Sequence, residues 1–324
     1  MSRISRYQQS ISNFIKTKSC YSDTIKSSNN VENIINLNDR ETSIILLNIS
    51  SEQYKKKNLK PHHCLYMASG IDLMLTVAMI NDNIKYFEGK FGKNTIKNFV
   101  SQAPIYVSRC LFQNMETLEG ILDKDKVLKI QQKIHSFLHN KLLDTSRQDD
   151  IKSNEKMHKL DVIKHKFNNK NLVNEKYKKL KLIDKDKLID YVERTYGSVC
   201  QCAFVLGWLL GLGDEKMIKK FEELGTHLGF LIKLANDFQN LERDIEISDG
   251  ITYNLIANYG IHECFRLFDE SKLKLLEGCI LLNVYNTTIK EVVDHIEKKF
   301  DDQLKNTDLE LTSRYSSFSS EEKT

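Results

Sequence analysis

Residues 63–80, HCLYMASGIDLMLTVAMI, form a segment that is apolar on almost every side when drawn as a helix. Such a helix is buried all round, so it needs a large bundle of other helices to cover it. The chain has only 2 Pro and 13 Gly in 324 residues, too few turn formers for a fold of many short strands. No apolar run reaches about 18 uninterrupted residues, which argues against a membrane-spanning helix. The sequence therefore predicts an all-α bundle with this segment at its centre.

The helical pattern continues along most of the chain after residue 30. Residues 38–41 resemble a helix start and lead into a run of apolar residues. Residues 189–212 and 215–241 are two strongly apolar segments that a short glycine-containing turn joins. We therefore expect one helical domain over residues 31–305. Its remaining helices are predicted over 103–121, 126–144 and 251–305.

The first 22 residues contain basic residues and many serines but no acidic residue. Several apolar side chains of this stretch would share one helical face: Ile4, Tyr7, Ile11, Phe14 and Ile15. A basic, serine-rich, amphipathic N-terminus is typical of a mitochondrial transit peptide. We therefore expect residues 1–30 to lie outside the fold and to direct the protein to mitochondria. An ordinary disordered tail is the alternative.

Two other segments have an unusual composition. Residues 152–188 hold 12 Lys against 5 acidic residues, which predicts an exposed, lysine-rich insertion loop. Aromatic residues for base stacking are nearly absent from this stretch, and the net charge of the whole chain is only +4. Both observations argue against a nucleic-acid partner. Residues 306–324 are expected to be a polar C-terminal tail.

Polar residues gather at two places in strongly apolar helices. The first cluster, Asp82 and Asn83, follows the central segment directly. The second cluster is Asn236, Asp237 and Asn240, within the segment 215–241. Polar groups in apolar surroundings are costly unless they have partners or a function. We expect the two clusters to face each other across a cavity of the bundle.

The two clusters stand where the all-trans prenyl diphosphate synthases carry their aspartate-rich motifs, and this stretch of sequence resembles that family. Further landmarks occur in the family's order, among them Lys57-Asn-Leu-Lys60-Pro61 and Arg194-Thr195. The resemblance runs from about residue 55 to residue 300 and implies an isoprenoid-synthase-type helical bundle. It also implies four basic residues as candidate diphosphate contacts: Lys57, Lys60, Arg194 and Lys233.

The family's chemistry, as the resemblance implies it, uses carboxylates at i, i+1 and i+4 of both motifs to hold Mg²⁺ on a diphosphate. One acid of three remains in each motif here, Asp82 in the first and Asp237 in the second. A cluster of Mg²⁺ ions would be badly under-neutralised by two carboxylates. Asp82 and Asp237 are therefore weak metal-ligand candidates.

Within the family, the chain is most similar to the non-catalytic subunit of mitochondrial decaprenyl diphosphate synthase, through Gly225-x-His227-Leu and Lys233-x-x-x-Asp237-x-Gln239. The resemblance predicts a regulatory or stabilising subunit of a heteromeric polyprenyl diphosphate synthase that makes the ubiquinone side chain. A catalytic subunit is the expected partner and would bind most of the Mg²⁺, and prenyl diphosphates are candidate ligands.

Two alternatives remain open. The chain could be a stand-alone, active prenyl diphosphate synthase. It could also be a class I terpene cyclase, because Asn236, Asn240 and Asp244 lie at i, i+4 and i+8, close to the metal motif of that class. The two catalytic alternatives require that this chain itself holds Mg²⁺.

Overall fold

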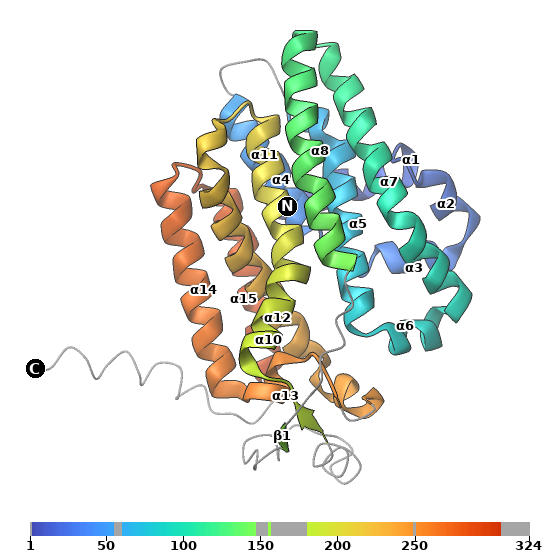
Figure 1. Ribbon diagram of the computed structural model, residues 1–324, viewed down its shortest axis with the longest axis vertical. Coiled ribbons are helices and arrows are strands. Elements are labelled where there is room, and N and C mark those ends of the chain that lie inside the picture. Colours follow the sequence, from blue (N-terminus) through green and yellow to red (C-terminus); the bar gives the residue numbers. More distant parts are fainter. Residues whose placement is uncertain (1, 55–59, 147–154, 157–179, 249–250, 306–324) are drawn as a thin grey trace, which may run out of the picture.

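The computed structural model describes residues 2–54, 60–146, 155–156, 180–248 and 251–305 (Figure 1). The N-terminal half consists of α1 (Arg3–Thr17), α2 (Ser22–Ser27), α3 (Asn29–Ile35), α4 (Glu41–Tyr54), η1 (Pro61–Cys64), α5 (Leu65–Asp82), α6 (Ile84–Phe91), α7 (Lys93–Glu119) and α8 (Lys124–Ser146). The remainder consists of β1 (Glu155–Lys156), β2 (Lys181–Leu182), α10 (Lys185–Val192), the π-helical turn η2 (Glu193–Gly197), α11 (Ser198–Leu210), η3 (Glu215–Met217), α12 (Ile218–Ile247), α13 (Leu255–Tyr259), α14 (Ile261–Leu281) and α15 (Thr287–Lys305).

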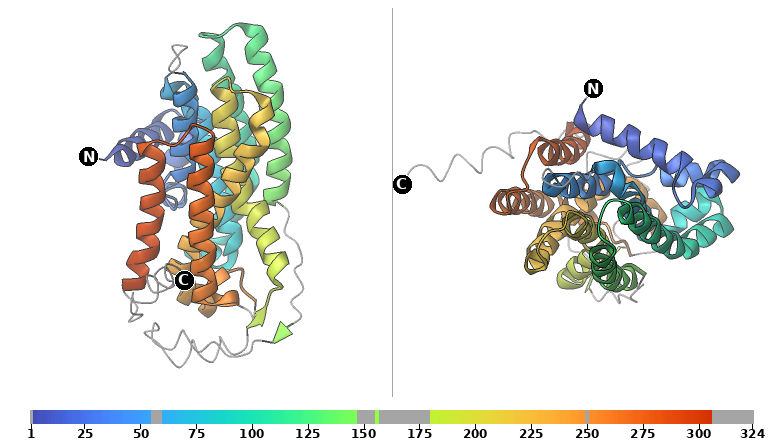
Figure 2. Two further views of the ribbon diagram at one scale, coloured as in Figure 1. Left: turned by 90° about the vertical axis from the view of Figure 1, so that its left-hand side faces the viewer. Right: turned by 90° about the horizontal axis from the view of Figure 1, so that it is seen from above.

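The expectation of an all-α helical bundle is confirmed. The helices α4, α5, α11 and α12 form the centre of the bundle, with α11 packed on both α4 and α12. The hairpin α7–α8 covers one side of this centre and the hairpin α14–α15 covers another (Figure 2). Most residues of α5 are buried, as its all-round apolar sequence predicts.

One described segment, Pro61–Asp82, is long and apolar enough to cross a membrane by length and composition. In the structure, 72% of its most apolar window is buried among the other helices. Its apolar residues are therefore accounted for by the protein core, as for the central helix of any large bundle.

The N-terminal segment packs on the bundle, which differs from our expectation that residues 1–30 lie outside the fold. Helix α1 contacts α4, α5 and α15, and its side chains Ile4, Ile11 and Ile15 are buried. These three residues belong to the apolar stripe that resembles a targeting peptide. An amphipathic helix can equally well bury such a stripe against a protein core, so the pattern alone does not distinguish a targeting peptide from a helix that packs on the bundle.

The predicted insertion, residues 152–188, is described only in part. Its ends form a short antiparallel pair of strands in which Glu155 lies opposite Leu182. Its last residues begin α10, so the loop is shorter at this end than predicted. Residues 157–179 and the predicted C-terminal tail, 306–324, lie outside the described residues.

A buried ion pair fixes the loop that leads into α4. The guanidinium of Arg40 pairs with the carboxylate of Asp72 on α5 and donates a hydrogen bond of 2.9 Å to the carbonyl oxygen of Ile35. Asn38 donates hydrogen bonds from its amide to the carbonyl oxygen of Asp72, at 3.1 Å, and to the hydroxyl of Thr76, at 2.7 Å. These contacts hold Asn38 and its neighbours against α5, at the edge of the pocket described below.

Two glycines bring α12 unusually close to its neighbours. A Cβ atom on Gly229 would lie 2.6 Å from the backbone nitrogen of Gly197, which ends η2. A Cβ atom on Gly225 would likewise collide with the backbone of Gln201 in α11. The spacing of four residues places both glycines on one face of α12. This close approach brings the next turn of α12, which carries Lys233, against Tyr196 of η2.

Candidate functional site: a lysine between two aspartates

The ammonium group of Lys233 lies between the single aspartates of the two motifs. Its Nζ is 2.6 Å from Oδ2 of Asp82, at the end of α5, and 2.6 Å from Oδ1 of Asp237, one turn further along α12. The side chains of all three residues are almost completely buried. The structure thus brings the two polar clusters together, and an internal cation joins them.

Asp82 has two further partners. The hydroxyl of Tyr191 on α10 donates to Oδ1 of Asp82 at 3.0 Å, and the hydroxyl of Tyr196 in η2 donates to Oδ2 at 3.3 Å. The ammonium of Lys233 also lies 5.5 Å from the centre of the Tyr196 ring. Three donors therefore surround the carboxylate of Asp82.

Both oxygens of Asp237 also accept hydrogen bonds within the protein. Oδ1 accepts from Lys233, and Oδ2 accepts from the backbone N–H of Leu255 at 2.7 Å. Burial raises the pKa of Asp237 to about 8, because the charged form is desolvated, and the nearby charge of Asp82 raises it further; Lys233 acts in the opposite direction but does not outweigh these effects. Burial acts to lower the pKa of Lys233, but the two carboxylates outweigh it, so that this pKa is raised and the ammonium stays charged.

A second layer of contacts supports Asp237 and the end of α12. The amide of Asn254 donates to the carbonyl oxygen of Asp237 at 2.8 Å and to Oδ2 of Asp244 at 2.9 Å. Arg243 donates to Oδ1 of Asp244 at 2.9 Å, and its guanidinium lies 4.3 Å from the centre of the Tyr86 ring. The carboxylate of Asp244 is thus held by an arginine and an amide.

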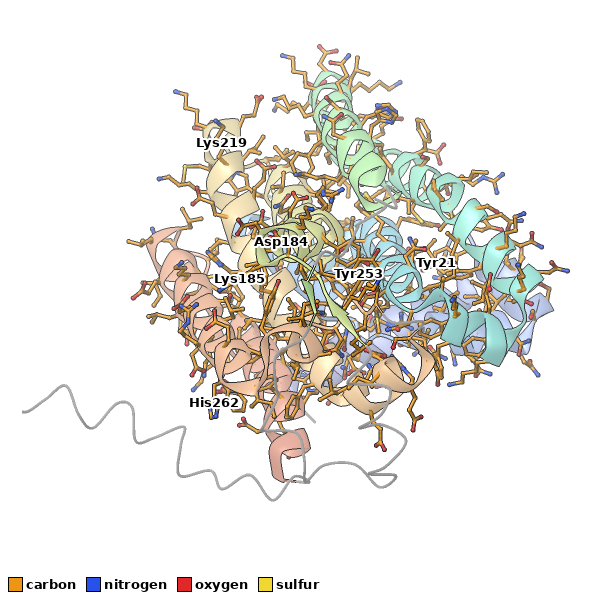
Figure 3. The ribbon with its side chains drawn as sticks, turned by 60° about the horizontal axis from the view of Figure 1, so that its bottom comes forward. Tyr21, Asp184, Lys185, Lys219, Tyr253 and His262 are labelled. Atoms are coloured by element: carbon orange, nitrogen blue, oxygen red, sulfur yellow. The ribbon has the colours of Figure 1, made fainter. Side chains whose placement is uncertain are left out.

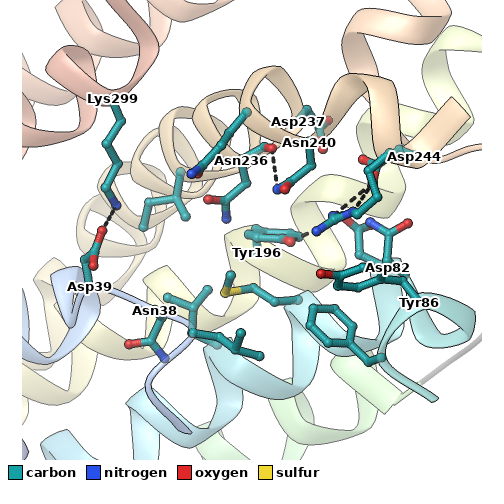
Figure 4. Close-up of a pocket in the computed structure, with 18 of the residues that line it drawn as sticks. Asn38, Asp39, Asp82, Tyr86, Tyr196, Asn236, Asp237, Asn240, Asp244 and Lys299 are labelled. Atoms are coloured by element: carbon teal, nitrogen blue, oxygen red, sulfur yellow. Dashed lines mark hydrogen bonds and ion pairs between the residues drawn. The ribbon is translucent and has the colours of Figure 1, made fainter. Parts of the chain in front are cut away.

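The two clusters open onto a pocket of about 270 Å³ between α5, α6 and α12 (Figure 4). This volume is just below the range usual for small-molecule sites, and the lining is rich in polar groups rather than apolar ones. Residues of both motifs line it: Asp82, Asn83, Asn236, Asp237, Gln239, Asn240 and Asp244. All three residues of the cyclase alternative therefore reach one pocket.

The acidic group at the opposite edge of this pocket is also joined to a lysine. Asp39, Glu41 and His295 are placed closely enough to share a metal ion. However, the ammonium of Lys299 pairs with Asp39 (Figure 4). The same ammonium lies 2.6 Å from Oε1 of Glu41. A metal ion would have to displace this lysine.

The residues present do not fit the Mg²⁺ cluster that the resemblance implies. Mg²⁺ requires nearly octahedral oxygen coordination and is usually held by carboxylates. The oxygens of Asp82 and Asp237 already accept hydrogen bonds from Lys233, from tyrosines or from the backbone. The other motif positions carry amides or, at Tyr86, a phenol, and these groups supply no negative charge. Lys233 occupies the position between the two motifs with a single positive charge.

The predicted diphosphate contacts are not brought together. Lys60 is exposed at the start of η1, and Arg194 pairs with Asp190 one turn away at 2.8 Å. Neither residue lines the pocket. Lys57 lies outside the described residues. Lys233 is buried in its ion pairs with Asp82 and Asp237 rather than free to bind a diphosphate. These pairs were not predicted from the sequence, although the spacing of four residues between Lys233 and Asp237 places both on one helix face and could have indicated one of them.

The sequence matches no family model, and no curated protein matches it significantly. Solved structures do match the fold. An FPP/GFPP synthase from Zymomonas mobilis aligns with a TM-score of 0.56 at 8% identity, over 91% of this chain and 98% of its own. A geranyltranstransferase from Thermotoga maritima aligns with a TM-score of 0.54 at 12% identity, over 92% of this chain and 100% of its own.

A third structure of this kind contains ligands. The geranyltransferase from Helicobacter pylori, complexed with magnesium and isoprenyl diphosphate, aligns with a TM-score of 0.54 at 11% identity, over 92% of this chain and 96% of its own. The chain therefore has the fold of the prenyl diphosphate synthases. At such low identity the likeness establishes the fold alone.

Proposed function

We propose that this chain is a non-catalytic subunit of an all-trans polyprenyl diphosphate synthase. The observation that carries the proposal is the position of Lys233 between Asp82 and Asp237, at 2.6 Å from each. A lysine that joins the remaining acids of both motifs makes a stable, metal-free arrangement. The chain retains the fold of a synthase while the residues that would hold metal ions hold one another.

Charge explains why this arrangement does not favour catalysis. Ionisation of an allylic diphosphate releases a highly charged leaving group, which metal ions stabilise. At the described site one ammonium is paired with the carboxyl groups of Asp82 and Asp237, which leaves no excess positive charge for a diphosphate. An anionic ligand at this place would be repelled unless it brought its own cations, and the acids that would bind those cations are already paired.

The proposed partner is a catalytic subunit with intact aspartate motifs, which would hold the Mg²⁺. Exposed apolar side chains on the hairpin α7–α8 support such a contact. Ile105 is 55% exposed and Phe112, two turns further along α7, is 51% exposed. Leu128 on α8 is 53% exposed. Where such exposed side chains form one contiguous apolar patch, they are typical of a surface that is covered in a complex.

We also propose that the complex makes the polyprenyl side chain of ubiquinone in mitochondria. The basic, acid-free N-terminus supports this location. Since α1 packs into the core through Ile11 and Ile15, we expect the mature chain to retain it. Cell fractionation followed by N-terminal peptide mapping tests both statements, because recovery outside mitochondria would refute the location and loss of α1 would refute its retention.

A class I terpene cyclase is the second candidate, because Asn236, Asn240 and Asp244 line one pocket. This candidate requires that Asp244 exchanges its contacts with Arg243 and Asn254 for a metal ion. It predicts a hydrocarbon product from a single prenyl diphosphate and Mg²⁺, lost in Asp244→Asn.

The test of the proposed function compares the chain alone with the chain co-expressed with a catalytic synthase. Both samples receive an allylic diphosphate, isopentenyl diphosphate and Mg²⁺. We expect no product from the chain alone, and a stable complex with increased product in the co-expressed sample. Turnover by the chain alone would support the stand-alone synthase instead. Failure to form a complex would refute the proposal that the chain assembles with a catalytic synthase subunit.

A further inference from the structure

A second cavity lies between the N-terminal helices and the bundle. It has a volume of about 260 Å³ and is lined by residues of α2, α3, α5 and α7 and by Tyr21, which precedes α2. On α5, Leu73 lines this cavity, whereas Leu75 and Met79 line the pocket that holds the two motifs. Successive residues of a helix are about 100° apart, so these side chains point to different sides of α5. The second cavity is therefore separate from the site of Lys233.

The inner part of this cavity is apolar. Its walls are formed by Val31 and Ile35 of α3, Leu73 of α5 and Phe99 of α7. The side chains from α3 and α5 are buried, and Phe99 is half-buried. A chain of CH₂ groups placed here would be removed from water on several sides, which favours binding of an apolar group.

Tyr21 holds the N-terminal wall of the cavity in place. It lies against α5 (Figure 3), where its hydroxyl donates to the carbonyl oxygen of Ser69 at 2.9 Å. Its ring lies 5.8 Å from the ring of Tyr106 on α7. The hydroxyls of Tyr106 and Thr24 on α2 are 2.7 Å apart. These contacts attach the start of α2 to both α5 and α7, so the cavity is built by the packing of the N-terminal segment on the bundle.

The mouth of the cavity is polar but uncharged. The side chains of Asn98 and Gln102 are exposed there, one turn apart on α7. The hydroxyl of Tyr106 donates to Oε1 of Gln102 at 3.1 Å. No charged side chain is among the described residues that line the cavity. An ionic group would therefore find no partner in this lining, whereas a hydroxyl can exchange hydrogen bonds with the two amides.

The volume sets the size of a fitting ligand. An apolar cavity of about 150 Å³ holds one molecule of benzene, which has six non-hydrogen atoms. By the same ratio, about 260 Å³ accommodates about ten non-hydrogen atoms. A ligand of this size would supply the van der Waals contacts that the lining atoms lack across an empty space.

We propose that this cavity binds a neutral, single-chain amphipathic molecule, a medium-chain alcohol in its simplest form. The alkyl chain lies against Ile35 and Leu73, and the hydroxyl lies at the mouth, between Asn98 and Gln102. The lining offers no cation to an anionic head group, so this ligand is distinct from the diphosphates considered for the family site. Because the cavity is shared between α2, α3, α5 and α7, the bound ligand stabilises the packing of the N-terminal helices on the bundle.

Calorimetric titration of the folded, full-length chain with a series of straight-chain primary alcohols tests the proposal. Each added CH₂ group should tighten binding about threefold to fourfold, as expected for burial of one such group. The gain should stop at about ten non-hydrogen atoms, when the chain fills the cavity. The carboxylate of the same length is the charge control and should bind at least about tenfold more weakly. No saturable binding, an affinity that keeps rising with chain length, or equal binding of the carboxylate would overturn the proposal.

A variant that fills the cavity tests its location. Thr95 is half-buried on α7 and lines the cavity, so Thr95→Phe places a larger side chain in it. This ring should displace at least two CH₂ groups of 1-nonanol and weaken its binding at least about tenfold. Ser101→Phe is the matched control, because Ser101 is exposed on the same helix and is not among the lining residues. It should leave the affinity unchanged.

Equal affinities of the two variants for 1-nonanol would show that the alcohol binds elsewhere and would overturn the assignment of the cavity. Circular dichroism establishes that each variant is folded before the titration. If Thr95→Phe does not fold, the chain-length limit and the carboxylate control in the unmutated chain decide the question.

Discussion

Nζ of Lys233 lies 2.6 Å from Oδ1 of Asp237, one helical turn away on α12, and at the same distance from Oδ2 of Asp82 on α5. The lysine therefore holds two central helices together through one buried charge. Such a contact is sensitive to the loss of a single partner, because the remaining charges are left in a medium that solvates them poorly.

Replacement of this lysine should destabilise the protein strongly. Lys233→Met leaves the buried carboxyl groups of Asp82 and Asp237 without their cation, which should cost about 3–5 kcal/mol of unfolding free energy. Lys272→Met is the matched control, because its ion pair with Glu297 at 2.7 Å is partly exposed and should be worth less than about 1 kcal/mol. Denaturant unfolding measures both values. Equal losses in the two variants would contradict a special role for Lys233.

The pH dependence of stability should change in Asp237→Asn. The pKa of Asp237 is raised from 3.8 to about 8 on folding, so the folded state binds this proton more tightly than the unfolded state. The stabilisation from this proton is complete below the unfolded pKa and is lost as pH rises through the folded pKa.

The unmutated protein should therefore lose more stability than Asp237→Asn between about pH 4 and about pH 8. Chemical denaturation at a series of pH values measures the difference. Parallel curves for the two proteins would show that Asp237 does not titrate in this range.

Glycine at the contact between α12 and η2 should be essential for packing. Gly229→Ala places a Cβ atom 2.6 Å from the backbone nitrogen of Gly197, and backbone must shift to relieve the overlap. We expect a loss of at least about 1–3 kcal/mol. Gly89→Ala in α6 is the control, because nothing lies within 4 Å of the added atom, and it should stabilise the protein by about 0.4–1 kcal/mol. A neutral Gly229→Ala would contradict the close approach.

The proposed partner surface can be tested by adding a charge. Phe112→Glu on α7 should weaken the complex with a catalytic synthase by at least about tenfold, because burial of an unpaired carboxylate is costly. Leu281→Glu is the matched control, since Leu281 is 80% exposed at the end of α14, away from the hairpin α7–α8. Pull-down and size-exclusion chromatography measure the complex. If Leu281→Glu weakens it and Phe112→Glu does not, the surface is assigned wrongly.

The sequence was informative wherever a local pattern decides the structure. The all-round apolar segment 63–80 predicted the central helix α5, because no exposed position can accommodate such a surface. The polar clusters around Asp82 and Asp237 were predicted to meet, and both line one pocket. In each case the property that allowed the prediction, an apolar composition on all sides or a polar cluster within an apolar helix, lies within one short stretch of sequence.

Other features depended on distant contacts. The salt bridge between Lys233 and Asp82 joins residues 151 positions apart. Gly225 and Gly229 let α12 pack closely on α11 and η2 beside it. The resemblance suggested a diphosphate contact for Lys233 and gave no reason to expect this pairing. The apolar stripe that includes Ile11 and Ile15 resembles a targeting peptide. In the structure it packs against α4, α5 and α15, and this packing depends on parts of the chain that are distant in the sequence.

The central claim is that the two aspartates bind a lysine in place of Mg²⁺. Calorimetric titration of Mg²⁺ into the purified chain, in the presence of inorganic diphosphate, tests it most directly. We predict no saturable binding at the site, and the same result for Asp82→Asn. Saturable binding of Mg²⁺ with diphosphate that Asp82→Asn and Asp237→Asn each abolish would contradict it.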